Sequence, residues 1–399
     1  MSLQVAKVKG IPIRLHFTLL IVFFLIAWTL AARLMPEIYP GLNTAAYWIM
    51  GITGAVILFI SVLLHELAHS IVAIRYGLKV RQIMLFIFGG VSDIEDEEVS
   101  KDFRKEFKIA VVGPITSFTI AGILAASLWL LTLISAIGSE NSINNGNTIT
   151  FTLAGVLYYG ALANVLLGGF NLIPAFPLDG GRMLRSALYR WKKDYDQSTK
   201  IAAKIGIGIS FGFMGFGFIS TFAGSFVGGI WLLLIGWFLN SGAQSYLAQH
   251  ELTSILSGVR LSTIMNTKVI AVREDMTIDF LIQEYFNIYA KDSFPVIDDS
   301  NHLVGMITFK DAWASPEHKR NSVRAADIMI QKPQLIIMRP NRTADDALKH
   351  MVRKHVSRIF ICDEEGKLIG LVSKTDIINA ASERKEYVDG VRRIVDQPT

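Results

Sequence analysis

The 399-residue sequence predicts a polytopic α-helical membrane domain of about six transmembrane helices, followed by a soluble α+β region. Hydrophobic residues make up 51% of the chain and the mean hydropathy is +0.41, which is too apolar for an ordinary soluble domain. Charge divides the chain, because residues 1–250 contain 18 Lys and Arg against 13 Asp and Glu, whereas residues 251–399 contain 21 of each sign. We therefore expect a membrane domain at residues 1–250 and soluble domains after it.

Six apolar runs in the first part are long enough to be transmembrane helices. A helix needs about 20 residues to cross about 30 Å of hydrocarbon. The runs cover residues 16–32, 47–74, 109–137, 149–173, 201–222 and 226–248. A cleaved signal peptide is the alternative for the first run, although it lacks a clear small-residue cleavage site.

Positive charge orients these helices. Lys and Arg gather before the first run, between the second and third, and between the fourth and fifth, whereas residues 138–148 and 221–226 contain neither. Cytoplasmic loops carry the excess of Lys and Arg, so six spans with both termini in the cytoplasm fit every loop. We expect a multi-pass protein of the cell membrane, in contact with the lipid bilayer. Since these loops explain the net charge of +5, we expect no nucleic-acid partner.

The second span contains His65, Glu66 and His69 in the stretch SVLLHELAHS. The two histidines are four residues apart and share one helix face, from which both imidazoles can bind one tetrahedral zinc ion. Zinc lowers the pKa of a bound water to about 7, and Glu66 can accept the proton as the water attacks a carbonyl. The alternative is that these groups line the ion path of a transporter.

Asp179 is the candidate for the third ligand that a zinc hydrolase needs, and it lies in the stretch FNLIPAFPLDGGRMLR at residues 170–185. The fourth span runs inward to this stretch, which returns Asp179 to the side of the two histidines. Two prolines interrupt regular helix, so an unwound segment can present the carboxylate to the metal. Asn171 could donate a hydrogen bond to a substrate carbonyl or developing oxyanion. The alternative is a Pro-Gly loop in which Asp179 caps a helix starting near Gly181.

Together the two stretches resemble the site-2 protease family of intramembrane zinc metalloproteases, whose signatures are HExxH and NxxPxPxLDG. The resemblance implies that His65, His69 and Asp179 bind Zn²⁺. It also implies that Glu66 is the general base and that Asn171 positions the substrate or stabilises an oxyanion. The implied substrate is a membrane-spanning segment of another protein, cut within or near the bilayer.

Two further stretches resemble parts of this family. Residues 84–98 resemble the segment that forms a small sheet beside the active site in this family. The exposed edge of such a sheet could bind the scissile segment as an added strand. A plain membrane-surface loop is the alternative. The stretch VVGPITSF, residues 111–118, resembles the third-span motif, in which Gly113 would permit close helix packing.

The soluble part contains a tandem repeat. Residues 262–272 align with residues 326–338 at an offset of 64, and residues 293–313 align with residues 358–378 at an offset of 65. Each copy reads strand, helix, strand, turn, strand, helix. The repeat resembles a pair of CBS domains. The expected copies cover residues 259–316 and 323–385.

The CBS resemblance implies an adenosine nucleotide, such as ATP, ADP or AMP, in the cleft between the copies. Asp311 and Asp376 could accept hydrogen bonds from ribose hydroxyls, while Thr308 and Ser373 approach phosphate from a helix N-terminus. The alternative is structural, because both hydroxyl residues are also expected N-caps. CBS pairs commonly dimerise, so we expect a homodimer through these domains.

The sequence therefore predicts a six-span zinc endopeptidase in which a cytoplasmic CBS pair binds nucleotide and regulates access to the active site. One alternative is a CBS-gated membrane transporter or channel that uses the His and Asp cluster as an ion site. Another is a catalytically inactive binding protein. The single cysteine, Cys362, excludes an intramolecular disulfide framework and any multi-thiolate metal site.

Overall fold

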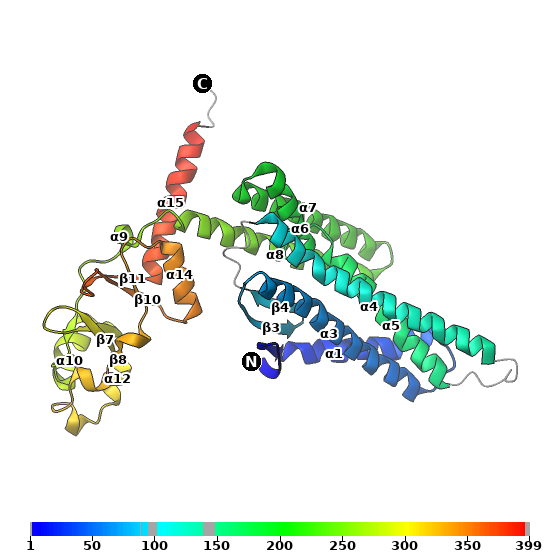
Figure 1. The fold of residues 1–399 in the computed structure, drawn as a ribbon, viewed down its shortest axis with the longest axis horizontal. Coiled ribbons are helices and arrows are strands. Elements are labelled where there is room, and N and C mark those ends of the chain that lie inside the picture. Colours follow the sequence, from blue (N-terminus) through cyan, green and yellow to red (C-terminus); the bar gives the residue numbers. More distant parts are fainter. Residues whose placement is uncertain (1, 88, 95–101, 139–147, 396–399) are drawn as a thin grey trace. The chain divides into compact units, whose positions relative to one another are not determined.

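The structure is a computed structural model that describes residues 2–87, 89–94, 102–138 and 148–395. The chain divides into two compact units, residues 1–247 and residues 248–399. Helices dominate the first unit, whereas the second unit mixes short strands and helices (Figure 1).

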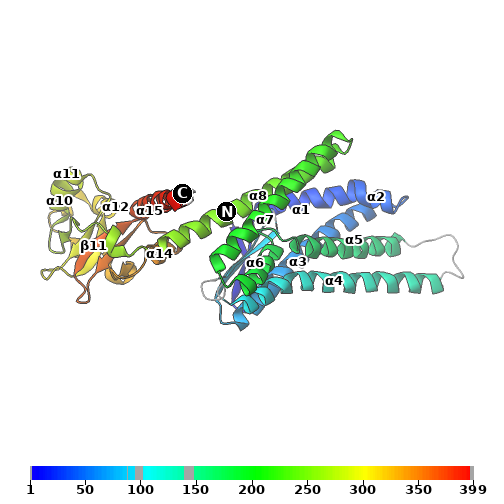
Figure 2. The same ribbon diagram turned by 90° about the horizontal axis from the view of Figure 1, so that it is seen from above.

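Six helical segments within the described residues are long and apolar enough to cross a membrane, as the hydropathy predicts. Helix α1 (Thr18–Thr29) continues through a π-helical turn (Leu30–Leu34) into α2 (Met35–Ile38) and forms the first segment. The others are α3 (Thr44–Arg75), α4 (Phe103–Gly138), α5 (Thr148–Asn171), α7 (Tyr195–Phe222) and α8 (Phe226–Leu256). Figure 2 shows α4 and α5 side by side. The protein is therefore a multi-pass membrane protein.

A four-stranded sheet packs against α3 in the same unit. Its strands lie in the order β1 (Ser2–Val8), β2 (Ile11–His16), β3 (Val80–Phe86) and β4 (Gly89–Ile94). Strands β1 and β2 form an antiparallel hairpin that the sequence analysis did not predict. Lys9 and Gly10 make its turn with φ angles of 46° and 86°, as a two-residue hairpin turn requires.

Strands β3 and β4 confirm the small sheet expected at residues 84–98. Residue 88 and residues 95–98 of this stretch lie outside the described residues. The two strands are antiparallel, and β3 pairs with β2 in parallel. Ile83 and Leu85 of β3 are buried with Val62 of α3, so the sheet is anchored to the helix that carries both histidines. Strand β4 is the outer strand on this side of the sheet.

A short irregular segment, residues 172–178, separates α5 from α6 (Asp179–Lys192). Its two prolines explain why the helix ends here. Phe176 is buried in this segment and stacks on Tyr246 of α8, with ring centroids 4.1 Å apart. The segment is therefore held against the helices that surround it.

The second unit contains two copies of one α+β motif, which confirms the tandem repeat. In the first copy, β6 (Ser293–Ile297) pairs in parallel with β5 (Val272–Arg273) and antiparallel with β7 (Leu303–Thr308). In the second copy, β10 (Arg358–Cys362) pairs in the same way with β9 (Ile337–Met338) and β11 (Leu368–Ser373). Strand β8 (Ile330–Gln331) pairs with β7. The helices are α9 (Leu261–Ile264), α10 (Ile278–Leu281), α11 (Asn287–Tyr289), α12 (Phe309–Ala314), α13 (Ala325–Ile328), α14 (Ala344–Arg353) and α15 (Lys374–Val395).

Candidate metal centre

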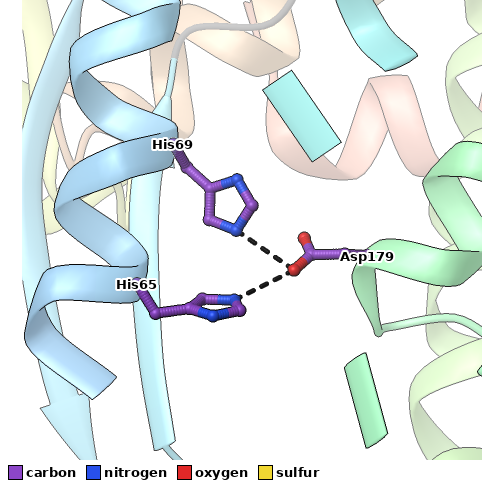
Figure 3. A group of neighbouring side chains, drawn as sticks. All are labelled: His65, His69 and Asp179. Carbon is purple, nitrogen blue, oxygen red and sulfur yellow. Dashed lines mark hydrogen bonds and ion pairs between the residues drawn. The ribbon is translucent and has the colours of Figure 1, made fainter. Parts of the chain in front are cut away.

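His65, His69 and Asp179 converge in the first unit although 110 residues or more separate the carboxylate from the histidines in the sequence (Figure 3). Asp179 Oδ2 lies 3.0 Å from His65 Nε2 and 3.1 Å from His69 Nε2. The two histidine side chains are buried and Asp179 is partly buried, with exposed fractions of 3%, 5% and 12% for His65, His69 and Asp179. One ligand atom from each residue lies within 4.8 Å of the others, so all three can contact one ion.

Regular helix geometry positions these three side chains. The two histidines lie on one face of α3, one turn apart, as their spacing predicts. Asp179 is the first residue of α6, directly after the irregular segment, so its carboxylate lies where the new helix begins. The Asp179 carboxylate contacts both histidines, so Asp179 does more than cap a helix that starts near Gly181, which was the alternative.

Helix α4 fixes the orientation of both imidazoles. His65 Nδ1 lies 2.9 Å from the Ser117 hydroxyl, and His69 Nδ1 lies 2.6 Å from the backbone carbonyl of Ile109. Pro114 lies inside this helix and has no N–H for the Ala110 carbonyl, so the helix lacks one backbone hydrogen bond next to Ile109. Such partners of the second nitrogen set the tautomer and direct the first nitrogen toward a metal.

The residues present fit a metal ion. A carbonyl only accepts hydrogen bonds, so His69 Nδ1 donates to Ile109. Its other nitrogen, Nε2, lies 3.1 Å from a carboxylate oxygen, so either a proton or a metal ion must lie between these two atoms. Two ligands about 2.1 Å from one tetrahedral zinc lie about 3.4 Å apart, so this spacing needs only a small adjustment.

Gly113 on α4 leaves the space that such an ion needs. A Cβ added to Gly113 would lie 2.6 Å from His65 Nε2 and closer still to His69 Nε2. Zinc binds imidazole nitrogen at about 2.0–2.1 Å. The space that a Cβ of residue 113 would fill is therefore the space in which an ion could contact both rings. Gly113 was expected to permit close helix packing, and in the structure it also lies directly against both histidine rings.

Glu66 lies next to the first histidine and faces the sheet. The Ser92 hydroxyl of β4 donates to Glu66 Oε2 at 2.7 Å. The sequence assigned no chemical role to Ser117, although it lies in the third-span stretch, and it did not indicate Ser92 or the Ile109 carbonyl, because no local motif relates them to the histidines. The one available signal was for Ser92, because it lies in the stretch expected to form a strand beside the active site.

Asn171 occupies the last position of α5, eight residues before Asp179. Its amide Nδ2 donates to the Leu167 carbonyl of the same helix at 2.9 Å. Among the described contacts, none is a hydrogen bond from Asn171 to the three clustered side chains. Asn171 is therefore near Asp179 in the sequence, but the described residues show no hydrogen bond between it and the cluster.

A cavity of about 360 Å³ lies in the second unit and contains two of the predicted nucleotide residues, Ser373 and Asp376, in its lining. Lys268, Lys291 and Arg358 also line it, together with Asp292, so the lining contains three cationic and two anionic side chains. The lining residues come from both copies of the repeat.

Ser373 and Asp376 also form the expected helix cap. The Asp376 N–H donates to Ser373 Oγ at 3.2 Å, and the Ser373 N–H donates to Asp376 Oδ2 at 2.8 Å. Thr308 caps α12 in the same way, since the Asp311 N–H donates to Thr308 Oγ1 at 3.2 Å. Thr308 and Asp311 do not line the cavity just described.

The fold and the cluster define a multi-pass membrane protein with a His-His-Asp cluster that could hold a metal ion. Residues 53–213 match the family model of peptidase family M50, and residues 261–312 and 325–383 match that of the CBS domain. A zinc metalloprotease of Methanocaldococcus jannaschii is 34% identical over 388 residues, covering 96% of this chain and 96% of the relative. A relative from Mycobacterium tuberculosis, whose name also describes a zinc metalloprotease, is 28% identical over 376 residues, covering 94% of this chain and 92% of the relative.

A solved structure of a site-2 protease from Methanocaldococcus jannaschii aligns with a TM-score of 0.41 at 34% identity, covering 62% of this chain and 95% of that chain. On the extent and identity of the sequence match, the chain belongs to peptidase family M50, the site-2 protease family, and it carries two CBS domains. It is a metalloprotease, and zinc is the metal that this family implies. The family assignment favours hydrolysis over the transporter or channel alternative.

Proposed function

We propose that this protein is an intramembrane zinc endopeptidase that cleaves membrane-spanning segments of other proteins. The observation that carries the proposal is the convergence of Asp179 with His65 and His69, which lie with Glu66 on a helix long enough to span a membrane. In this proposal the three clustered residues are the zinc ligands and Glu66 is the general base. Asn171, at the end of the adjacent helix, positions the substrate.

The chemistry of each residue follows from its surroundings. Zinc, when bound, supplies a Lewis acid that lowers the pKa of water to about 7. Glu66 accepts the proton of the attacking water and returns it to the leaving amine. Ser92 holds the Glu66 carboxylate at the sheet, while Ser117 and the Ile109 carbonyl hold the imidazoles in one orientation.

The edge of the sheet supports a binding mode for the substrate. Strand β4 carries Ser92, whose hydroxyl contacts Glu66, so a strand added along β4 would bring its peptide bonds next to the general base. A transmembrane helix satisfies its backbone hydrogen bonds internally. It therefore has to unwind before cleavage, and β4 would provide replacement hydrogen bonds.

The proposal extends to location and regulation. We place the membrane domain at residues 1–250 and the CBS domains at residues 259–316 and 323–385, in a cell membrane with both termini cytoplasmic. The CBS pair binds an adenosine nucleotide in the cavity lined by Ser373 and Asp376, and its three cationic side chains suit phosphate. Nucleotide binding then regulates access to the active site, and the CBS domains form a homodimer.

The catalytic proposal is tested with the full-length protein in detergent, by metal analysis and by cleavage of a panel of single-span substrates. We expect one zinc per chain in both the parent and Glu66→Gln, and a loss of cleavage of about 10²- to 10⁴-fold in the variant. Glu37→Gln is the control, because its side chain is 65% exposed and its ion-pair partner is Arg33, outside the cluster. Absence of zinc, or unchanged cleavage by Glu66→Gln, would contradict the proposal.

A further inference from the structure

Arg185 and Glu106 form a buried ion pair that the catalytic mechanism does not use. Arg185 of α6 is 1% exposed and Glu106 of α4 is fully buried. Arg185 Nε donates to Glu106 Oε1 at 2.8 Å, and Nη2 donates to the same oxygen. Apolar replacements of a buried ion pair are often as stable as the pair itself, so stability alone does not explain its presence.

The surroundings hold Arg185 in one place. Its guanidinium carbon lies 5.4 Å from the ring centroid of Phe176, 4.9 Å from that of Tyr195 and 5.3 Å from that of Tyr246. Nη1 also donates to the Tyr246 hydroxyl. Burial opposes the charged form, but the Glu106 carboxylate raises the pKa of Arg185 above its ordinary value. The guanidinium therefore stays charged and directs fixed hydrogen bonds at its partners.

One face of α4 connects this pair to both histidines. Glu106, Ile109, Gly113 and Ser117 follow each other at intervals of three or four residues, which places them on one side of the helix. Ile109 and Ser117 contact the two imidazoles, and Gly113 faces both Nε2 atoms. Glu106 contacts α6, the short helix that begins with Asp179. The same face therefore aligns the nitrogen ligands and the helix that supplies the carboxylate.

We propose that the Arg185–Glu106 pair is a positioning pair that sets the place of Asp179 relative to the two histidines. The inference rests on the proposed function, because it assumes that these three residues bind the metal. Arg185 lies six residues after Asp179 on the same short helix, so an anchor at Arg185 limits how far the first turn can move. The hydroxyl of Ser186 donates to the Phe103 carbonyl and provides a second contact between α6 and α4.

The test uses the full-length protein in detergent and measures its zinc affinity by competition with a chromogenic chelator. The visible spectrum of the Co²⁺-substituted protein and the thermal midpoint of unfolding are measured in parallel. Arg185→Met is compared with the double variant Arg185→Met/Glu106→Met, and Lys192→Met on the exposed end of α6 is the control. We expect Arg185→Met to raise the zinc Kd about 10- to 100-fold, as loss of an outer contact of a metal site does. We expect the double variant to recover the thermal midpoint of the parent. Its zinc Kd should nevertheless stay at least about tenfold above that of the parent, and its Co²⁺ spectrum should differ from that of the parent.

A double variant that binds zinc within about twofold of the parent, with an unaltered Co²⁺ spectrum, would overturn the inference and leave the pair a packing feature. If the double variant does not fold, Arg185→Lys decides, because lysine keeps the charge and loses the planar fork. A raised zinc Kd at an unchanged thermal midpoint supports positioning, and an unchanged Kd refutes it. A parent without zinc, or Asp179→Asn with parental zinc affinity, would instead overturn the proposed function itself.

Discussion

Replacing Gly113 by alanine tests the metal centre most directly. The added Cβ would lie 2.6 Å from His65 Nε2 and closer still to His69 Nε2, whereas ordinary contacts begin at 3.4 Å, so the rings or the helix must retreat by at least about 0.8 Å. Metal sites tolerate departures of only about 0.2 Å from their normal ligand distances. We therefore expect Gly113→Ala to raise the zinc Kd by at least about 100-fold, which corresponds to about 2.7 kcal/mol.

The assay is zinc competition with a chelator in detergent, with the thermal midpoint measured in parallel. Gly122→Ala is the matched control, because it lies on the same helix and its added Cβ has no atom within 4 Å. Alanine favours helix over glycine by about 1 kcal/mol, so the control should be at least as stable as the parent and bind zinc normally. Zinc affinity of Gly113→Ala within about threefold of the parent would refute the placement of the ion between the two imidazoles.

Three further substitutions test neighbouring contacts. Ser92→Ala removes the donor to Glu66 and should lower the cleavage rate at saturating substrate about tenfold with zinc content unchanged; loss of zinc would show that Ser92 supports the metal instead. Ser117→Ala removes the partner of His65 Nδ1 and should raise the zinc Kd about tenfold in a chelator titration, and an unchanged Kd would contradict its orienting role. Ser373→Ala removes a helix cap and should lower the unfolding free energy of the CBS region by about 1 kcal/mol in calorimetry, while unaltered ATP binding would separate capping from nucleotide contact.

The membrane helices could be predicted from the sequence because a spanning segment must be both long and apolar. Their ends could not, since α4 begins at Phe103 in a charged stretch that hydropathy excludes. The β1–β2 hairpin was missed for a related reason. Its Lys and Arg were interpreted only as charges preceding a membrane helix, although Lys9 and Gly10 separate two short apolar-polar alternations.

The three clustered side chains were predicted because histidines four residues apart share a helix face, and a Pro-rich break can return a carboxylate to them. Their supporting contacts come from the packing of α4 on α3, which the sequence alone does not define. The Ile109 contact is made by a backbone carbonyl and so has no residue signature. Asn171 shows the reverse case, because a motif predicts a role toward the substrate whereas its amide contacts its own helix.

The backbone contact at Ile109 has an evolutionary consequence. His69 bonds to the main chain there, so another apolar side chain can replace the fully buried isoleucine without removing the acceptor, and only packing limits the choice at this position. Gly113, one turn away, has no such freedom, because any side chain would enter the space between the imidazoles. Two positions that contact the same ring are therefore constrained differently, and a search for invariant residues would find the glycine but could miss the position that contributes only its backbone carbonyl.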